Sequence, residues 1–575
     1  MRITLVFIFF PLLIFSQLKK EYYDNEQTQL KNETDYYKGM PQGAFYEYYK
    51  NGKVSRKGYY YSGKEDSVWI FYFEDGTPKA IERFFRGKKS GTNFYYFKSG
   101  KIAQRTKFNN DLADSTWTSY HENGKVKSIE VFENGKKQGD WKYYHDNGQI
   151  ESEGKFEKDK KEGAVKTYFK SGKPAALEHY CVGKPCGKWT DYYESGQLKF
   201  EKEYKDSILY LWTMFNDKGK QLVRNGNGQI TATFDNGIIR AMGRYKEGLM
   251  DSLWRFFHGN GELDYEVNYR DGMLNGYYSS YYQNHNIKSE GEFISNKKNG
   301  IWKFYFTDAK LEMSGPLKDG LREGKWIYYY NNEKKESEGA YINDKQSGTW
   351  EYFYRTGEKW KQGNYETGIK TGTWTTWFEN GKKLQEGPYV TGLEEGVWQS
   401  WWDNGQLKDE GTFKKGKLEG LWSGWYSNGK PNYVGKYNKN SKKDGTWEYW
   451  YDNGGAREKS SYVNGIKDGK SITYYEKGGF VDSEGKYRRG HQNGTWKYYY
   501  ETGGIMKEQN FDHGHLSGKS VSYYTNAALQ SISNYSVIND RRKGKVQSVP
   551  DGDWIFYDKS GKEISRINYK NGLKN

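Results

Sequence analysis

Cysteine and histidine are scarce in this chain of 575 residues, which holds two cysteines and eight histidines. The two thiols, Cys181 and Cys186, are too few for a tetrahedral zinc site, and no histidine spacing completes one. His121 and His145 fall in neighbouring copies of a repeat described below. On a sheet such positions lie about 9.6 Å apart, too far to share a metal through bonds of about 2 Å. The His-Gly-His sequence at 513–515 lacks a third ligand. We therefore expect no metal site.

Motifs of catalysis and of phosphate binding are also lacking. Neither G-x-S-x-G nor G-x-x-x-x-G-K-[ST] stands in a strand–turn–helix context. Acidic pairs such as Glu394-Glu395 are interpreted as solvated turn residues rather than as a glycosidase pair. A repeated sheet presents the same residues again and again, whereas catalysis needs different residue types that converge in one pocket. We expect no enzyme, no catalytic residues and no cofactor.

Long hydrophobic runs are missing except at the N-terminus. Residues Ile3 to Phe15 are apolar apart from Thr4 and Pro11, after a positive Arg2. This run is shorter than the about 20 residues of a membrane span, and Ser16 offers a small residue for cleavage. We predict a signal peptide at 1–16, cleaved near Ser16, and export to the periplasm, the outer envelope or the medium. An uncleaved anchor is the alternative.

Aliphatic residues are few, but aromatic residues make up 18% of the chain and tyrosines number 55. Low aliphatic content is typical of disorder, but Trp and Tyr at a fixed period argue against it. Glycines recur at turn positions so often that no room is left for helices. The chain is therefore expected to be all-β.

The sequence is organised by a repeat. A "Gly-x-aromatic" triplet recurs along the chain, and most of its steps are 24 residues, as at Trp302, Trp326 and Trp350. With weaker units included, we count about 22 copies from near Gly43 to the C-terminus. A period of about 20–50 residues is typical of a repeat array.

One unit fits a β-hairpin. In the unit that begins at Trp141, Asn147-Gly148 is a strong signal for a two-residue type I′ turn, which requires positive φ at both positions. Such a turn sets a register in which three pairs of residues face each other on one side of the hairpin. These pairs are His145 with Ile150, Tyr143 with Ser152, and Trp141 with Gly154.

A glycine opposite each indole leaves bare backbone over which the broad ring can lie. The same offset (i, i+13) recurs along the chain. It joins Trp141 to Gly154, Trp302 to Gly315, Trp326 to Gly339, Trp350 to Gly363, Trp374 to Gly387, Trp398 to Gly411 and Trp422 to Gly435. It fails where Trp69, Trp117 and Trp189 oppose Glu82, Glu130 and Lys202, so those units are expected to pack less regularly.

A second turn, such as Asn134-Gly135, follows each hairpin; its loop length and the stagger of the next strand stay open. Successive hairpins then form an elongated, single-layer antiparallel β-meander, a solenoid-like array. Stability must come from ladders of aromatic residues on one face and from pairs of Tyr, Lys and Glu on the other.

The pattern G-x-W-x-x-Y-Y-x-N-G followed by G-x-Y-x-x-G resembles the MORN repeat, and more closely the bacterial variant of the YwqK-type antitoxin family. It is legible at Trp350–Tyr354 with Gly363, Tyr365 and Gly368, and at 445–454. The resemblance covers about residues 41–573. It implies the sheet fold and admits many roles, one of them neutralisation of a partner.

We divide the chain into a signal peptide (1–16), a leader or N-terminal cap (17–40), a first array (41–205), an irregular joint (206–240) and a second array (241–575). The second array contains an insertion at 525–551, which Arg541, Arg542, Lys543 and Pro550 mark as an exposed loop. Cys181 and Cys186 flank a second turn, where an exported protein is expected to form a local disulfide.

Basic residues outnumber acidic ones, and the net charge is +16. Lysine pairs such as Lys136-Lys137 fall at turns, so the two long edges of the sheet should be basic. Solubility and protection of sheet edges explain this; adhesion to an anionic membrane surface or polysaccharide is the alternative. Exposed aromatic rows can also bind glycans or a peptide, although mutual covering of the indoles is preferred.

Three functions remain open at this stage. The first is an exported, non-enzymatic surface for protein binding or scaffolding. The second is an antitoxin-like or immunity-like protein, which the YwqK-type resemblance implies. The third is a module that binds anionic lipid or glycan. Nucleic acid is not expected as a partner because export removes the chain from it, and the oligomeric state stays unknown.

Overall fold

The computed structural model describes residues 17–540 and 545–575. These residues form 54 strands and no helix, connected as an antiparallel meander in an open sheet. The expected all-β array of hairpins is thus confirmed. The predicted signal peptide at 1–16 and the basic triplet at 541–543 lie outside the described residues.

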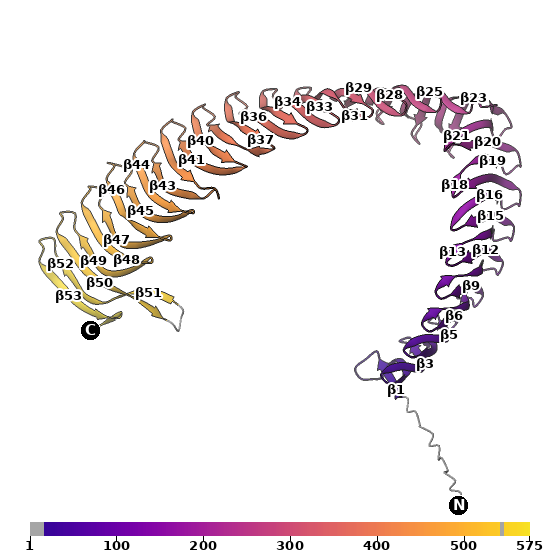
Figure 1. The fold of residues 1–575 in the computed structure, drawn as a ribbon, viewed down its shortest axis with the longest axis horizontal. Coiled ribbons are helices and arrows are strands. Elements are labelled where there is room, and N and C mark those ends of the chain that lie inside the picture. The colour runs from indigo at the N-terminus through magenta and orange to yellow at the C-terminus, as the bar shows by residue number, and fades with distance from the viewer. Residues whose placement is uncertain (1–16, 541–544) are drawn as a thin grey trace, which may run out of the picture. The chain divides into compact units, whose positions relative to one another are not determined.

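The contacts divide the chain into two compact units. The first reaches Glu262 and includes Glu266–Met273; the second comprises Leu263–Tyr265 and Leu274–Asn575. Within each unit the strands lie side by side in one layer (Figure 1). The joint expected at 206–240 lies inside the first unit, so the boundary between the units falls C-terminal to it.

That predicted joint is nevertheless locally distinct. β21 (Ile208–Phe215) and β23 (Asn227–Thr233) enclose a strand of only four residues, β22 (Gln221–Arg224). Val223 of β22 is fully buried in a small apolar cluster with Ile230, Ala241 and Trp254. The aliphatic sequence of this segment therefore forms a local core rather than a separate domain.

The regular part of the second unit shows the repeat most clearly. Its strands are β32 (Gly324–Tyr329), β33 (Lys335–Ile342), β34 (Lys345–Phe353), β35 (Lys359–Glu366), β36 (Ile369–Trp377), β37 (Lys383–Val390), β39 (Gly396–Trp401), β40 (Leu407–Lys414), β41 (Lys417–Trp425) and β42 (Pro431–Tyr437). In these hairpins Trp326 pairs with Gly339, Trp350 with Gly363, Trp374 with Gly387, Trp398 with Gly411, and Trp422 with Gly435. Trp302 pairs with Gly315 and Trp141 with Gly154 in the same way. The register follows the offset between tryptophan and glycine in the sequence.

The first turn of each unit differs from the prediction. In the hairpin of β14 (Gly139–Tyr144) and β15 (Ile150–Glu157), the His145 amide donates to the Gln149 carbonyl, and the Gly148 amide donates to the His145 carbonyl. The loop therefore has three residues and ends on Gly148 with φ of +91°. Ile150 pairs with Tyr144, not with His145, because a bulge beside Tyr144 absorbs the extra residue. Beyond that bulge the predicted pairs are restored.

The second turn resolves what the sequence left open. Between β12 (Val126–Glu133) and β13 (Lys136–Lys137), Glu133 pairs with Lys136 across a loop of two residues. Asn134 and Gly135 have φ of +51° and +81°, as a type I′ turn requires. The strict two-residue hairpin loop thus occurs at the second turn and not at the first.

A bulge after each second turn sets the packing of the indoles. Glu338 pairs with Glu351 and Ala340 with Ser347, so three residues of β34 stand opposite the single Gly339. Gly348 begins this bulge with φ of +66°. The arched strand lets a side chain lean back over the preceding hairpin.

The indole consequently lies over a different glycine from the one predicted. A Cβ built on Gly363 would stand 2.1 Å from Cδ2 of Trp374, which belongs to the next hairpin, rather than against its registered partner Trp350. Gly315, Gly339, Gly387, Gly411 and Gly435 are covered in the same way by Trp326, Trp350, Trp398, Trp422 and Trp447. Gly154 is the exception, because its following position is Val165 and Trp141 reaches to 3.0 Å. The glycine therefore joins two hairpins rather than two strands of one.

This arrangement also corrects the expectation for the irregular units. Trp69 lies over Gly58 and is fully buried although it pairs with Glu82. The effect of Glu82 falls on the following unit, where the small Asn93 takes the indole position. In this unit the residue at the glycine position therefore acts on the next aromatic position and not on its own.

The two ends of the described sheet are formed by hairpins. β1 (Gln17–Tyr22) pairs with β2 (Leu30–Tyr37), which supports the N-terminal cap over a loose leader. The predicted loop at 525–551 is instead a hairpin extension. β50 (Leu529–Asp540) continues past its neighbour and pairs with β51 (Lys545–Pro550) before β52 (Gly552–Tyr557) resumes the repeat.

Candidate interaction surfaces

The first-turn edge is a ladder of side chains bonded to backbone. Tyr354 Oη donates to the Trp377 carbonyl at 2.8 Å, and Asn332 Nδ2 donates to the Arg355 carbonyl at 2.8 Å. His121 Nε2 lies 2.8 Å from the Tyr144 carbonyl oxygen and occupies the same position in its unit. Each rung links one hairpin to the next, so this edge is structural. Among the described residues no group of three metal ligands forms.

The face that carries the tryptophans, here called the indole face, is a core rather than an exposed aromatic row. Trp302 and Trp350 are 0% and 1% exposed. The second lysine of some turn pairs contributes to it: Lys298 Nζ lies 4.0 Å from the centroid of the Trp302 ring, and burial lowers the pKa of this lysine. Such lysines point onto the indole face and do not add positive charge to the sheet edges, which the sequence predicted to be basic.

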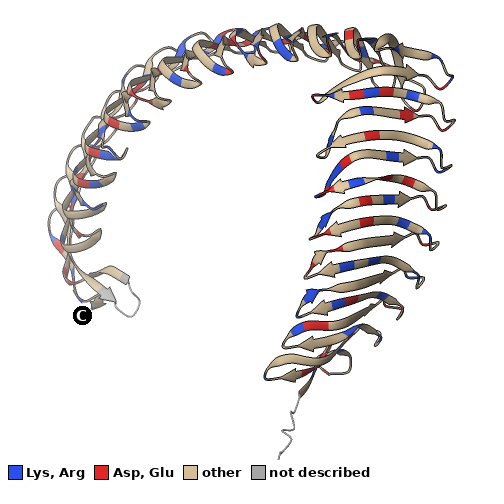
Figure 2. Ribbon diagram, turned by 45° about the vertical axis from the view of Figure 1, so that its right-hand side comes forward, with Lys and Arg blue, Asp and Glu red and all other residues tan. Residues whose placement is uncertain are grey.

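The other side of the sheet, here called the opposite face, carries half-buried carboxylates in networks. Glu290 accepts hydrogen bonds from Tyr277 and Tyr305, each at 2.6 Å, and Lys303 Nζ lies 3.2 Å from it. Burial raises the pKa of the Glu290 carboxyl, but these donors outweigh burial and hold the pKa below its usual value. Blue and red segments occur together on many of the strands (Figure 2).

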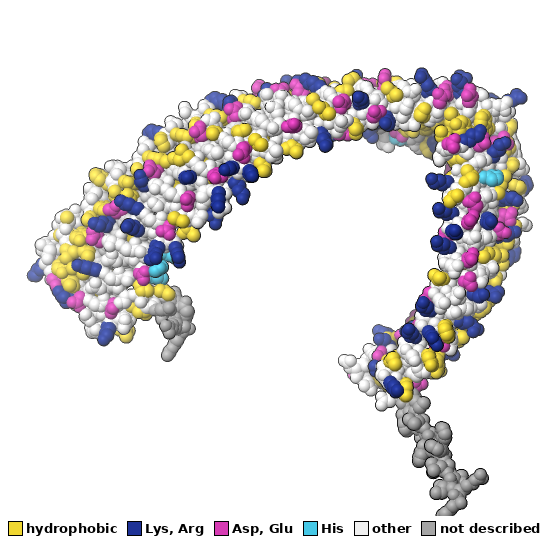
Figure 3. All heavy atoms as spheres, in the orientation of Figure 1, with side chains coloured by type: hydrophobic (Ala, Val, Ile, Leu, Met, Phe, Trp, Pro, Cys, Tyr) yellow, Lys and Arg dark blue, Asp and Glu magenta, His cyan; other side chains and the backbone are white. Residues whose placement is uncertain are grey.

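A row of exposed side chains runs along the middle of the opposite face. It is formed by the residue just before each tryptophan position, which alternation turns away from the indole face. In the second unit several of these residues are large and apolar: Tyr277, Ile301, Val397 and Leu421, which are 46%, 59%, 55% and 63% exposed. Hydrophobic side chains reach the visible surface of this unit (Figure 3). The row, which we call the apolar row, is apolar at these four positions, whereas Lys325, Thr349 and Thr373 occupy the positions between Ile301 and Val397.

The second-turn edge mixes aliphatic and basic residues. Ile294 and Ile342, just before their turns, are 55% and 54% exposed, and Lys297 and Lys345 follow the same turns. The lysines that remain outward are fewer than the sequence count suggests, and Lys297 also approaches Asp319 at 3.6 Å. Composition alone revealed the lysines but not the aliphatic residues beside them.

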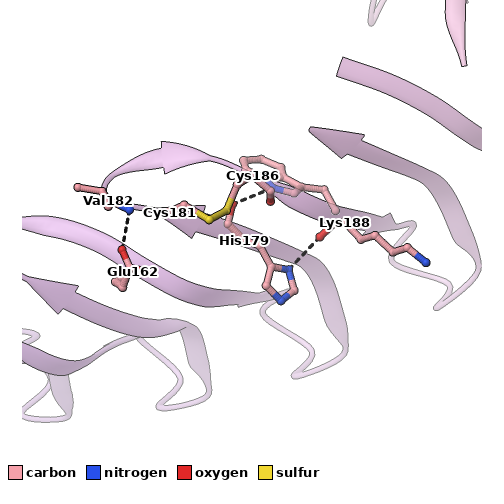
Figure 4. Close-up of a disulfide and its surroundings, with 7 residues drawn as sticks. Glu162, His179, Cys181, Val182, Cys186 and Lys188 are labelled. Carbon is pink, nitrogen blue, oxygen red and sulfur yellow. Dashed lines mark hydrogen bonds between the residues drawn. A yellow bond between two sulfur atoms is a disulfide. The ribbon is translucent and has the colours of Figure 1, made fainter. Parts of the chain in front are cut away.

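In the first unit a disulfide bond links the two strands at one of the second turns. Cys181 and Cys186 form a disulfide with Cα atoms 5.8 Å apart across the turn at Val182-Gly183 (Figure 4). The Val182 amide also donates to the Glu162 carboxylate at 2.6 Å. The disulfide therefore stabilises one turn and does not link segments that are distant in the sequence.

The fold defines an all-β repeat protein, and the comparison with protein families gives the repeat a name. The MORN repeat variant matches eleven segments, at 41–61, 113–134, 137–158, 161–181, 185–206, 250–271, 370–391, 394–415, 443–464, 492–513 and 550–571. The chain thus carries this repeat in both units. No match was found among curated proteins.

Some solved structures also match the chain. Two are crystal structures of TcdB2-TccC3, one with Cdc42 and one without the hypervariable C-terminal region; a third is the Photorhabdus luminescens Tc holotoxin pore with a TccC3 mutation. Each is 10% identical and matches 97% of this chain with a TM-score of 0.12. The chain spans about a third of their length (34%, 34% and 33%). A superposition this poor carries no argument about fold or function.

No helix among the described residues is both long and apolar enough to cross a membrane.

Proposed function

We propose that this chain is an exported, non-enzymatic repeat protein whose sheet serves as a protein-binding or scaffolding surface. The observation that carries the proposal is the apolar row on the opposite face of the second unit. The indoles lie within their own face, so they are not available in bulk to a partner. Tyr277 with Ile301, and Val397 with Leu421, instead expose large apolar side chains in two pairs of neighbouring units, as interaction sites do.

The chemistry of the row indicates the kind of partner. Between Tyr277 and Leu421 the row also contains Lys325, Thr349 and Thr373, so one of its seven residues is charged. A partner with an extended, largely uncharged apolar strip fits this surface. A neutralised toxin would use the same row if the chain acted as an immunity-like protein.

The experiment is capture from an envelope extract by the chain from Gln17 onward. The double variant Ile301→Lys/Leu421→Lys places charges in the row and should lose a partner that the native chain retains stoichiometrically. Thr446→Lys, at an exposed row position that is already polar, is the matched control and should retain it. Equal capture by all three proteins would refute the assignment of the surface. A captured protein that arrests growth when the chain is absent would favour the immunity-like role.

Export is tested separately by the N-terminus of the protein isolated from cells. Cleavage near Ser16 predicts a mature chain that begins at Gln17, which mass spectrometry of the terminal peptide detects. An intact Met1 terminus on protein recovered from the cytoplasm would contradict export.

A second candidate, attachment to an anionic membrane surface, is favoured by the second-turn edge. Exposed aliphatic residues beside lysines, such as Ile294 with Lys297, combine apolar insertion with charge attraction. Sedimentation with phosphatidylserine vesicles should then fall steeply with salt and with Ile294→Asp/Ile342→Asp. Binding that persists in high salt, or that the double variant leaves unchanged, would exclude this candidate.

A further inference from the structure

The row of rings that flank the indoles is interrupted over three consecutive tryptophan-containing units of the second unit. In most regular units the residue two positions after the tryptophan is aromatic, and its ring centroid lies 5.9–6.2 Å from the indole. These flanking residues are Phe304, Tyr328, Tyr352, Tyr449 and Tyr498. Three consecutive units instead have Thr376, Ser400 and Gly424. The row of flanking rings therefore stops and resumes.

As a result, two indoles lack an aromatic residue at the flanking positions on both sides. A flanking ring such as Tyr352 lies beside its own indole and also 6.4 Å from the next one, Trp374. Trp398 stands between Thr376 and Ser400, so it has no such ring on either side. Trp422 stands between Ser400 and Gly424, and the ring of Tyr433 lies over Gly424 in place of a flanking residue. Trp422 is half-buried, unlike Trp350 and Trp374.

A hollow of about 250 Å³ occupies this place. Trp398, Phe413 and Trp422 form its aromatic walls, and Ser400, Asp409 and Glu394 line it with polar groups. Phe413 stands edge-on to both indoles, with centroids 5.9 and 5.5 Å away. The walls are therefore held in place by ring contacts that do not fill the hollow.

The polar groups are oriented by neighbours. Ser400 Oγ donates to Asp409 Oδ2 at 3.1 Å, and Tyr433 Oη donates to Asp409 Oδ1 at 2.5 Å. Glu394 accepts a hydrogen bond from Tyr389 at 3.1 Å. Two carboxylates and two glutamines, Gln385 and Gln399, thus line a hollow to which no lysine or arginine contributes, in a chain whose net charge is +16.

We propose that this hollow binds one pyranose residue of a neutral glycan. Aromatic walls suit the apolar C–H faces of a sugar ring, and carboxylate and amide oxygens accept hydrogen bonds from its hydroxyls. The two carboxylates repel acidic sugars. A shallow aromatic hollow with a few oriented polar groups has the general character of a small-ligand site. The site lies on the indole face and is independent of the protein-binding row.

The test fills the hollow with the residue that its neighbours carry. Ser400→Tyr restores the aromatic row, and Thr446→Tyr adds the same side chain on the exposed opposite face as a control. The purified chain from Gln17 onward is titrated with soluble oligomers of glucose, mannose and N-acetylglucosamine and, for comparison, of galacturonate. Calorimetry and tryptophan fluorescence report binding.

The proposal expects at least one neutral oligomer to bind the native chain and the Thr446→Tyr control, and at least tenfold weaker binding by Ser400→Tyr. Asp409→Asn, which keeps the shape, should also bind more weakly and decides the matter if Ser400→Tyr fails to fold by circular dichroism. Absence of binding to every neutral oligomer, unchanged binding by the variants, or tighter binding of galacturonate would overturn the proposal.

Discussion

The indole of Trp374 lies on Gly363, a residue of the preceding hairpin, and its Nε1 donates to the carbonyl of Asn364 at 3.2 Å. The in-register partner of Gly363 is nevertheless Trp350. Each such glycine therefore has one neighbour through backbone pairing and another through side-chain packing. This double relation connects successive hairpins where no second layer packs against the sheet.

Gly363→Ala should destabilise the second unit, because the new Cβ would stand 2.1 Å from the Trp374 ring. Overpacking of this kind costs about 1–3 kcal/mol. Hydrogen exchange followed by mass spectrometry should show faster exchange in β35 and β36, since arrays lose structure locally. Gly504→Ala, at a glycine with no atom within 4 Å of its Cβ position, is the control. Equal exchange in both variants would show that the contact is not tight.

The coupling of glycine and tryptophan can be transferred to a unit that lacks it. Ser460 and Ser471 occupy the two positions and share a hydrogen bond of 2.6 Å. Ser471→Trp alone should destabilise because its ring meets the Ser460 side chain. Adding Ser460→Gly should recover stability, with a coupling energy of about 0.5–3 kcal/mol in a double-mutant cycle of thermal unfolding. Strictly additive effects would contradict packing between hairpins.

Acid should weaken the opposite face through Glu290. Its pKa in the folded chain lies below the ordinary 4.5, so its ionised form contributes stability above that value, and the contribution is lost as the pH falls through the folded pKa. Glu290→Gln should therefore unfold at a temperature that changes less between about pH 5 and pH 3 than that of the native chain. Glu292→Gln, at an exposed position, is the control and should follow the native profile. Parallel profiles for all three would refute the role of Glu290.

Loss of the disulfide should act locally. The loop that Cys181 and Cys186 close is short, and chain entropy predicts about 2 kcal/mol for it. The double variant Cys181→Ser/Cys186→Ser should exchange faster at 181–186 and leave the second unit unchanged, and reduction of the native protein should reproduce this pattern. Unfolding that spreads through the whole first unit would contradict a local brace.

The sequence alone determined the architecture and much of the register. A repeat period of mostly 24 residues, a glycine 13 residues after most of the tryptophans and turn glycines too frequent for helices lead to a meander of hairpins, because strand pairing is a local consequence of spacing. The two-residue loop was assigned to Asn147-Gly148, where Gly148 ends a three-residue loop instead. Both loops contain Asn-Gly, and a bulge restores the register, so the pattern cannot separate them.

Only the tertiary structure decided which glycine each indole covers, which lysines stay outward and which face is exposed. The bulge at Gly348 arches the strand, so that Trp350 lies on Gly339 of the preceding hairpin. The simple alternation of side chains along a strand does not predict this contact. The same packing draws Lys298 over Trp302 and leaves Ile301 exposed on the other side. Spacing along the chain specifies neighbours within a hairpin, whereas contacts between hairpins depend on how the backbone bends.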